Sequence, residues 1–446
     1  MLNKRHIKLL LLSRLELLLA ASSLGCLVGA LSSTFFWLVG QCAKYLWADS
    51  VLLEISAANF TFHWAIAASL FAAAFAASVL ARKLPGQRVQ GPADLIHTTQ
   101  TGAPLSIRCG LISSLITFFS LCGGASVGIF GPLVHLGGTI GIAVKNIRKK
   151  FDTQLFIGAG VAAAISAVFS APLGGAIFAH EAIMRRFSTF GTTPIIASSF
   201  AGYLSAKVLL GDHRLLPITD PMSIRVEFIF AAITVGLICG IISCFYSIYV
   251  ARSSKIFSLI PVSNRLRPII PAVALLGISP FFPHLLGTGL ETINLAANGK
   301  IALSLLLLLI PLKIFFTGLC IGNGLSGGVF GPALYFGVMI GAAIDYLFQV
   351  KLGISASFCV VGAACCVACV VGAPLACVVI IFELTGSYEW SLLAMLGVVV
   401  SVQISRSVFG RSIFDLQLSM RGVKTSDDWV PNTLHQPSNS SNTTTK

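Results

Sequence analysis

Charged residues are scarce in this chain of 446 residues. Asp, Glu, Lys and Arg together make up 10% of it, whereas hydrophobic residues make up 56%. A soluble globular domain carries about 25% charged residues, so the composition excludes that class. The ten-residue stretches of alternating hydrophobicity that a membrane β-barrel needs are also missing from the sequence. The composition therefore predicts an α-helical protein that crosses a membrane several times.

Several kinds of site are missing too. There is no Gly-x4-Gly-Lys-Ser/Thr loop for a nucleotide. The His and carboxylate residues of the apolar segments are too few and too scattered to form a nucleophile–base pair or a metal site. Cys365, Cys366 and Cys369 lie in one apolar segment without adjoining His or carboxylate residues, so we interpret them as small packing residues. We expect no enzyme, no metal and no cofactor.

The net charge of +14 comes from basic clusters that lie between apolar segments, for example at residues 4–8, 145–150, 185–186 and 265–267. This pattern is typical of the positive-inside rule and not of nucleic-acid binding. It places both termini in the cytoplasm. The expected location is a bacterial inner membrane, with membrane lipid around the protein.

One phrase occurs twice, at an offset of 200 residues: Gly128–Pro132 reads GIFGP and Gly328–Pro332 reads GVFGP. A glycine-rich loop followed by proline predicts the start of a helix. Such a start presents unpaired N–H groups and the positive end of the helix dipole, which suits an anion. Glycines five and nine positions after each proline predict close helix packing: Gly137, Gly141, Gly337 and Gly341.

The repeat extends further along both halves. Ala171–Leu173 and Ala373–Leu375 both read Ala-Pro-Leu, and each is followed by apolar residues and one acid, Glu181 or Glu383. Interrupted helices at matching positions of two halves indicate an internal repeat with a site at its interface.

We divide the chain into a basic N-terminus (1–8), a first membrane repeat (9–251), a linker (252–268), a second membrane repeat (269–423) and a disordered polar tail (424–446). A short helix is expected to start at Pro92, with Asp94 in its first turn. The other expected helices lie near 9–40, 61–82, 105–122, 130–144, 154–184 (in two pieces), 190–210, 226–251, 269–283, 301–320, 330–349, 355–384, 391–408 and 409–423.

These residues resemble the CLC chloride channel and transporter family over about residues 10–420. The family's Gly-Lys/Arg-Glu-Gly-Pro-x-x-His/Gln motif falls on Gly128–His135, and its Gly-x-Phe-x-Pro motif is matched by Gly328–Pro332. Its Gly-Ser-Gly-Ile-Pro turn falls on Arg88–Pro92, which matches mainly through the proline. Two shorter stretches are also family-like: Ala171–Leu173 and Phe382–Thr385.

The resemblance implies an all-α polytopic fold of the CLC type, with two inverted-topology repeats whose broken helices meet at a central anion site. It also implies a homodimer with one chloride path in each subunit. The expected site residues are Val89, Gln90, Phe130, Gly131, Pro132, Val329, Phe330, Gly331 and Phe414. The paired regulatory CBS domains that some members carry at the C-terminus are not expected here.

The departures from the family pattern concern mechanism. The glutamate that plugs the anion path and carries protons in exchangers is replaced by Phe130. The second, proton-relaying glutamate falls on Ala182, with Glu181 just before it. The serine and tyrosine that reach the central anion fall on Val89 and Phe414. Backbone donors at helix starts need no particular side chain, but a phenyl ring cannot take up a proton. We therefore predict uncoupled, channel-like conduction of chloride.

Several alternatives stay open at this point. The ring of Phe130 is a filler, a hydrophobic gate or a permanent block. The alternative function is a proton–anion antiporter that uses Glu181 or His135. Against this, Glu181 is expected to pair with Arg185 four residues on, and His135 is expected to be an ordinary buried histidine with satisfied ring nitrogens.

Two further charged residues lie in apolar segments. Lys313 either raises the positive potential near the anion path or extends to a membrane interface. Glu383 is expected to partner a backbone amide or a basic residue.

Overall fold

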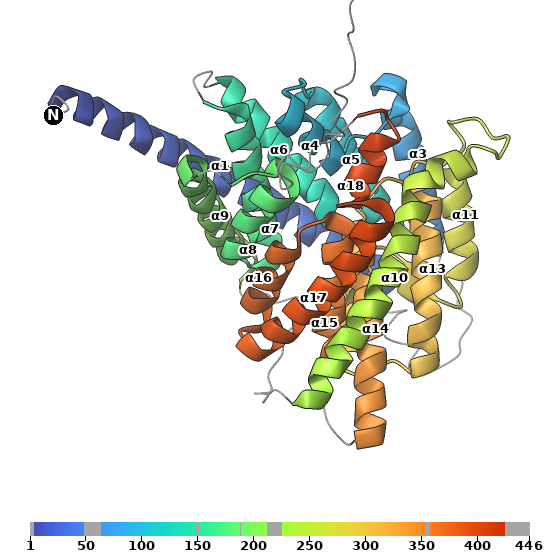
Figure 1. Ribbon diagram of the computed structural model, residues 1–446. Helices are drawn as coiled ribbons and strands as arrows, with labels where there is room; N and C mark the ends of the chain where they lie inside the picture. Colours follow the sequence, from blue (N-terminus) through green and yellow to red (C-terminus); the bar gives the residue numbers. More distant parts are fainter. Residues whose placement is uncertain are drawn as a thin grey trace, which may run out of the picture.

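The computed structural model describes residues 4–48, 64–147, 151–187, 189–211, 225–352 and 357–423, almost all of them helical (Figure 1). Seven helices in this part are long and apolar enough to cross a membrane. The prediction of a multi-pass α-helical membrane protein is confirmed. The expected tail, 424–446, lies outside the described residues.

Short helical pieces lie between longer helices in the part of the chain that is expected to form the first repeat and the linker. Its elements are α1 (Lys4–Ala43), η1 (Lys44–Ala48), α3 (Trp64–Ala81), η2 (Pro85–Gln87), α4 (Pro92–Thr101), α5 (Ile107–Cys122), α6 (Phe130–Ile147), α7 (Thr153–Phe169), α8 (Pro172–Phe178), η3 (Ala179–Met184), α9 (Thr189–Leu210) and α10 (Val226–Phe257). α1 begins earlier than expected, and α10 continues through residues 252–257 of the expected linker.

The part of the chain that is expected to form the second repeat also alternates long and short helices. Its elements are α11 (Ile269–Ile278), η4 (Pro283–Leu285), α12 (Leu290–Ala297), α13 (Leu303–Gly322), α14 (Phe330–Leu352), α15 (Phe358–Val371), α16 (Pro374–Thr385), α17 (Tyr388–Phe409) and α18 (Ile413–Ser419). The short helix α12 was not expected from the sequence.

The breaks before α8 and α16 have a local cause. Ser170 ends α7 in the left-handed conformation, with φ 53°, and Gly372 ends α15 in the same way, with φ 75°. Pro172 and Pro374 then begin the next helices, because proline lacks the N–H that a continuing helix would need. The expected interruption at each Ala-Pro-Leu is confirmed.

The glycines that follow each repeated phrase allow two helix pairs to pack closely. A Cβ atom on Gly137 would lie 2.4 Å from the carbonyl oxygen of Gly160 in α7. A Cβ atom on Gly337 would lie 2.4 Å from the carbonyl oxygen of Gly362 in α15. The close packing expected from Gly-x-x-x-Gly is therefore confirmed in both repeats.

The two repeated phrases bind each other. The amide of Gly128 donates to the carbonyl of Gly328 over 2.8 Å, and the amide of Gly328 donates to the carbonyl of Gly128 over 2.6 Å. A Cβ atom on Gly128 would lie 2.6 Å from the amide nitrogen of Gly331. Only glycine fits at this contact between the repeats.

Threonines in the helices before the two repeated phrases hydrogen-bond to the loops that lead into these phrases. Thr317 in α13 donates to the carbonyl of Ser126 over 2.9 Å, and Thr117 in α5 donates to the hydroxyl of Ser326 over 3.4 Å. Each threonine therefore belongs to one repeat and holds the loop of the other. The offset of 200 residues applies to this pair of contacts as well.

Two glutamates cap each other's helices across the repeats. The carboxylate of Glu181 accepts hydrogen bonds from the amides of Leu375 and Ala376, at the start of α16, over 3.1 and 2.8 Å. The carboxylate of Glu383 accepts two from the start of α8, over 2.9 and 2.7 Å. A carboxylate at a helix start satisfies free amides and complements the dipole. The expected backbone partner of Glu383 is confirmed.

The close packing of α14 on α15 predicts a stability difference between two glycine substitutions. Gly337→Ala forces a Cβ atom against a backbone carbonyl that cannot move cheaply, and we expect a loss of about 1–3 kcal/mol. Gly277→Ala in α11 meets no atom within 4 Å and should keep or slightly raise stability. Thermal unfolding midpoints in detergent measure both, and equal midpoints would contradict this account of the packing.

Candidate functional site

A cavity of about 570 Å³ lies between the two repeats, at the end of the molecule where the C-terminal end of α10 leads to α11. α4 and α18 border it near the upper end of Figure 1. Six of the expected site residues line it: Val89, Gln90, Gly131, Pro132, Val329 and Phe414. We call it the basic cavity. Its lining in the described part of the chain does not include Phe130, Phe330 or Gly331.

The starts of α6 and α14 face this cavity together. The first amides of a helix have no acceptor within their own helix and carry the positive end of its dipole. The bridge between Gly128 and Gly328 holds both starts at one wall. Tyr246 in α10 fixes the second of them, because its hydroxyl donates to the carbonyl of Val329 over 2.9 Å. No local pattern around Tyr246 in the sequence indicates this role.

The start of α4 contributes less to anion binding than expected. The amide of Gln90 donates to the hydroxyl of Ser113 over 2.9 Å, and the amide of Gly91 donates to the carboxylate of Asp94 over 2.9 Å. Val89 presents an apolar side chain. α4 therefore bounds the cavity, while two of its leading amides already have protein acceptors.

Phe130 belongs to a cluster of buried rings. Its ring stacks on Phe169 with centroids 4.5 Å apart and lies 5.0 Å from the ring of Phe330. The ring centroid of Phe178 lies 6.3 Å from that of Phe330. We call these four residues the aromatic cluster. Phe130 and Phe330 are the first residues of α6 and α14, so the aromatic cluster adjoins the helix starts that border the basic cavity. Phe130 is only 2% exposed.

The charges of the basic cavity are unequal. Its lining contains five arginines: Arg82, Arg88, Arg265, Arg267 and Arg421. Asp94 is the single carboxylate of that lining among the described residues. One oxygen of Asp94 accepts from Arg88 over 2.7 Å and from Arg421 over 3.2 Å. Burial lowers the pKa of the Arg421 guanidinium, Asp94 opposes this effect, and the like charge of Arg88 adds to it.

The structure tests part of what was expected of His135 and Lys313. His135 lines the basic cavity and is 1% exposed, and no partner for its Nε2 atom occurs in the described part of the chain. The expected burial of His135 is confirmed, and a partner for this atom stays a prediction. Lys313 is fully buried and does not extend to an interface. Its ammonium donates to the carbonyl of Gly287 over 3.0 Å and lies 5.0 Å from the centre of the Tyr335 ring.

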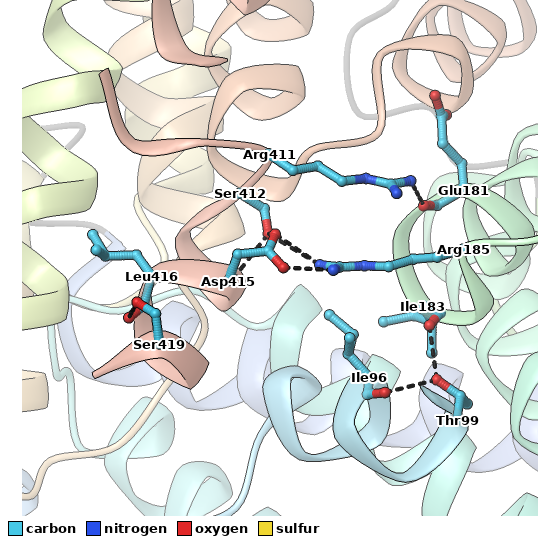
Figure 2. Close-up of polar contacts among 10 residues, drawn as sticks. All are labelled: Ile96, Thr99, Glu181, Ile183, Arg185, Arg411, Ser412, Asp415, Leu416 and Ser419. Atoms are coloured by element: carbon cyan, nitrogen blue, oxygen red, sulfur yellow. Dashed lines mark hydrogen bonds and ion pairs between the residues drawn. The ribbon is translucent and has the colours of Figure 1, made fainter. Parts of the chain in front are cut away.

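Arg185 does not pair with Glu181, which corrects our expectation (Figure 2). Its guanidinium binds both carboxylate oxygens of Asp415 in α18, one of them over 2.8 Å. The reason is local: η3 is a π-helix, and Arg185 ends it with φ 57°, so the four-residue spacing of an α-helix no longer applies. Arg411 donates to the backbone carbonyl of Glu181, and Ala182 is buried at 1% exposure. Together these bonds hold α18, and with it Phe414, against the first repeat.

Comparisons with known proteins agree with this architecture. The sequence model described as "Voltage gated chloride channel" matches residues 68–406. An uncharacterized protein of Methanocaldococcus jannaschii is 27% identical over 70% of this chain and 78% of its own length. An H+/Cl− exchange transporter of Vibrio cholerae is 26% identical over 64% of this chain; the alignment spans 64% of that protein, less than two thirds of its length.

Solved structures match the fold over most of the chain. A slow cyanobacterial Cl−/H+ antiporter gives a TM-score of 0.79 at 20% identity, covering 91% of this chain and 97% of that one. A CLC-type fluoride/proton antiporter gives 0.73 at 20% identity, covering 94% and 99%. The predicted CLC-type fold of two inverted repeats is confirmed.

Neighbouring arginines in the sequence should differ sharply in their effect on stability. Arg185→Gln removes the guanidinium that binds both carboxylate oxygens of Asp415, a side chain only 13% exposed, and we expect a loss of about 3–5 kcal/mol. Arg186→Gln removes a pair 3.9 Å long whose side chains are 53% and 58% exposed, so we expect a loss of about 0–1 kcal/mol. Thermal unfolding in detergent compares them; a similar small loss in both would show that the Arg185–Asp415 pair does not hold α18.

Proposed function

The chain belongs to the voltage gated chloride channel family, and from that premise we propose that it conducts chloride passively across the membrane. Each subunit of a homodimer contains its own path. The path runs from the basic cavity, past the starts of α6 and α14, to the aromatic cluster. Phe130 acts as a hydrophobic gate at the point where the family carries a glutamate.

Anion binding rests on backbone groups. Gly131, Pro132 and Val329 line the basic cavity, which brings the starts of both helices to its wall. The amides of Phe130, Gly131, Val329 and Phe330 are the donors for chloride, since helix starts bind anions through N–H groups. Neither Val89 nor Phe414 has a side chain that can donate a hydrogen bond, so the anion is held more weakly and passes faster.

The observation that carries the absence of proton coupling is the environment of Phe130. Its ring lies among three other phenylalanine rings and is 2% exposed. A side chain that transfers protons has to titrate, and no residue of the aromatic cluster does. Glu181 does not replace the lost relay, because its carboxylate accepts two amide hydrogen bonds as the cap of α16.

A second candidate function is proton–anion antiport, and one observation favours it. His135 lines the basic cavity with an Nε2 atom that has no partner among the described residues. Histidine can relay protons near neutral pH. The name of the Vibrio cholerae relative, an H+/Cl− exchange transporter, agrees with this alternative.

Chloride efflux from proteoliposomes, with external pH recorded in the same vessel, distinguishes the two candidates. We expect chloride to leave only when valinomycin carries compensating potassium, and the external pH to stay constant. This follows from the absence of a titratable group in the aromatic cluster. Proton movement in a fixed ratio to chloride would establish antiport instead, and His135→Ala would then be expected to abolish it.

Removing the ring at position 130 tests the gate. We expect Phe130→Ala to raise chloride efflux about tenfold, which corresponds to a barrier lower by about 1.4 kcal/mol. A matched control is Phe358→Ala, which removes a fully buried ring from another cluster, 5.6 Å from Phe228 and 5.6 Å from Trp390. Both variants lose stability, but only the first should gain flux. Unchanged efflux in Phe130→Ala would show that the ring merely fills space.

A further inference from the structure

The basic cavity carries more positive charge than one chloride neutralises. Five guanidinium groups and one carboxylate line it among the described residues, which leaves a formal excess of four positive charges. A path for a monovalent anion gains attraction from such a field. Two features show that part of this charge has no carboxylate partner among the described residues.

The first feature is the position of Arg82 and Arg265, which both line the cavity. The hydroxyl of Ser78 donates to the carbonyl of Arg265 over 2.9 Å, and Arg82 follows Ser78 by one helical turn at the end of α3. Both arginines therefore border the cavity on the same side. Within the described ranges neither has a carboxylate partner. Both residues are solvent-exposed, so their guanidinium groups are accessible to an anion.

The second feature is the sharing of Asp94. Arg88 and Arg421 both donate to the same oxygen of this carboxylate. One negative charge cannot neutralise two guanidinium groups, so one positive charge remains. The side chains of Arg88 and Arg421 are 47% and 35% exposed, whereas that of Asp94 is 9% exposed. The arginines therefore keep free donor positions.

We propose that the basic cavity is also a regulatory site for a multivalent anion that carries two or more closely spaced phosphate groups. One phosphate group lies between Arg82 and Arg265, and another binds the free donors of Arg88 and Arg421. Arginine suits this role because its planar fork binds phosphate through paired hydrogen bonds. The volume of about 570 Å³ falls in the range of small-ligand pockets, roughly 300–1,000 Å³.

The positive-inside rule puts the basic linker around Arg265 and Arg267, and so the mouth of this cavity, in the cytoplasm. Two cytoplasmic sources have the required chemistry: a soluble polyphosphate compound and the headgroup of a diphosphate lipid such as cardiolipin. An anion bound in the cavity obstructs chloride entry, so the inhibition rests on the proposed function. The binding of the phosphate-containing anion in the cavity does not depend on the proposed function.

Titration calorimetry on the purified full-length protein in detergent tests the binding, with inorganic pyrophosphate as the probe. We expect pyrophosphate to bind at least about tenfold more tightly than orthophosphate, since each charge-assisted contact is worth more than the 1.4 kcal/mol of a tenfold change. The double variant Arg82→Gln/Arg265→Gln should weaken pyrophosphate binding about tenfold or more. Arg186→Gln, a half-exposed arginine outside the cavity lining, is the matched control and should bind like the parent protein.

The source of the phosphate groups is separated by repeating the titration in nanodiscs. Weaker pyrophosphate binding in cardiolipin than in phosphatidylglycerol of equal charge shows that the lipid headgroup occupies the site. Equal binding in both lipids shows that the ligand is soluble. No binding of pyrophosphate, or binding that the double variant leaves unchanged, overturns the proposal.

Chloride efflux measured without pyrophosphate separates this inference from the proposed function. If the protein conducts chloride but does not bind pyrophosphate, only the regulatory site is refuted. If the protein binds pyrophosphate but does not conduct chloride, only the proposed function is refuted. Where both are present, pyrophosphate on the cytoplasmic side should inhibit efflux, and the double variant should need about tenfold more of it.

Discussion

Two backbone hydrogen bonds between Gly128 and Gly328 constrain the whole centre of the molecule. They join equivalent positions of the two repeats, so each repeat donates one bond and accepts the other. No side chain fits at either position, because a Cβ atom would come within 3 Å of the opposite backbone. The starts of α6 and α14 are consequently held close together. The other contacts of the site are arranged around this pair.

The contacts farther out follow the same reciprocal rule. Thr117 and Thr317 each hold the glycine loop of the other repeat. Glu181 and Glu383 each cap a helix of the other repeat. Every one of these contacts occurs twice, once in each direction, with partners about 200 positions apart in the chain. A rigid frame of this kind keeps free amides in place without help from the side chains that point at the anion.

This separation of roles explains how the chain departs from its family at the titratable positions while it keeps the fold. Anion binding at a helix start depends on backbone geometry. Proton transfer depends on one side chain with the right pKa. Under the proposed function, Phe130 in place of the glutamate removes the second property and leaves the first, provided that the ring can be buried. Phe169 and Phe330 supply that burial at 4.5 and 5.0 Å.

The features that the sequence predicted well are local or repeated. The helix start at Pro92, the breaks at Pro172 and Pro374 and the close packing at Gly137 and Gly337 each depend on residues within a few positions of one another. The threonine contacts also lay within reach of sequence analysis, since they share the offset of 200 residues.

Contacts that depend on tertiary structure could not be predicted. Arg421 meets Asp94 across 327 positions, and Tyr246 reaches Val329 across 83. The pairing of Glu181 with Arg185 failed because a π-helix changed the spacing on which the prediction relied. Periodicity assumes a regular helix, and the site consists largely of the places where helices are irregular.

Lys313 shows how the internal repeat can clarify a residue that looks functional by itself. Its equivalent 200 positions earlier is Ser113, whose hydroxyl accepts the amide of Gln90 and so holds the loop before α4. Lys313 also holds the loop before α12, but as a donor: its ammonium donates to the carbonyl of Gly287. The carbonyls of Leu285 and Gly287 and the ring of Tyr335 stabilise the charge of Lys313. A buried lysine that makes such a structural contact does not require an anion beside it. Under the proposed function, the attraction for chloride is therefore assigned to the arginines of the basic cavity and to the two helix starts.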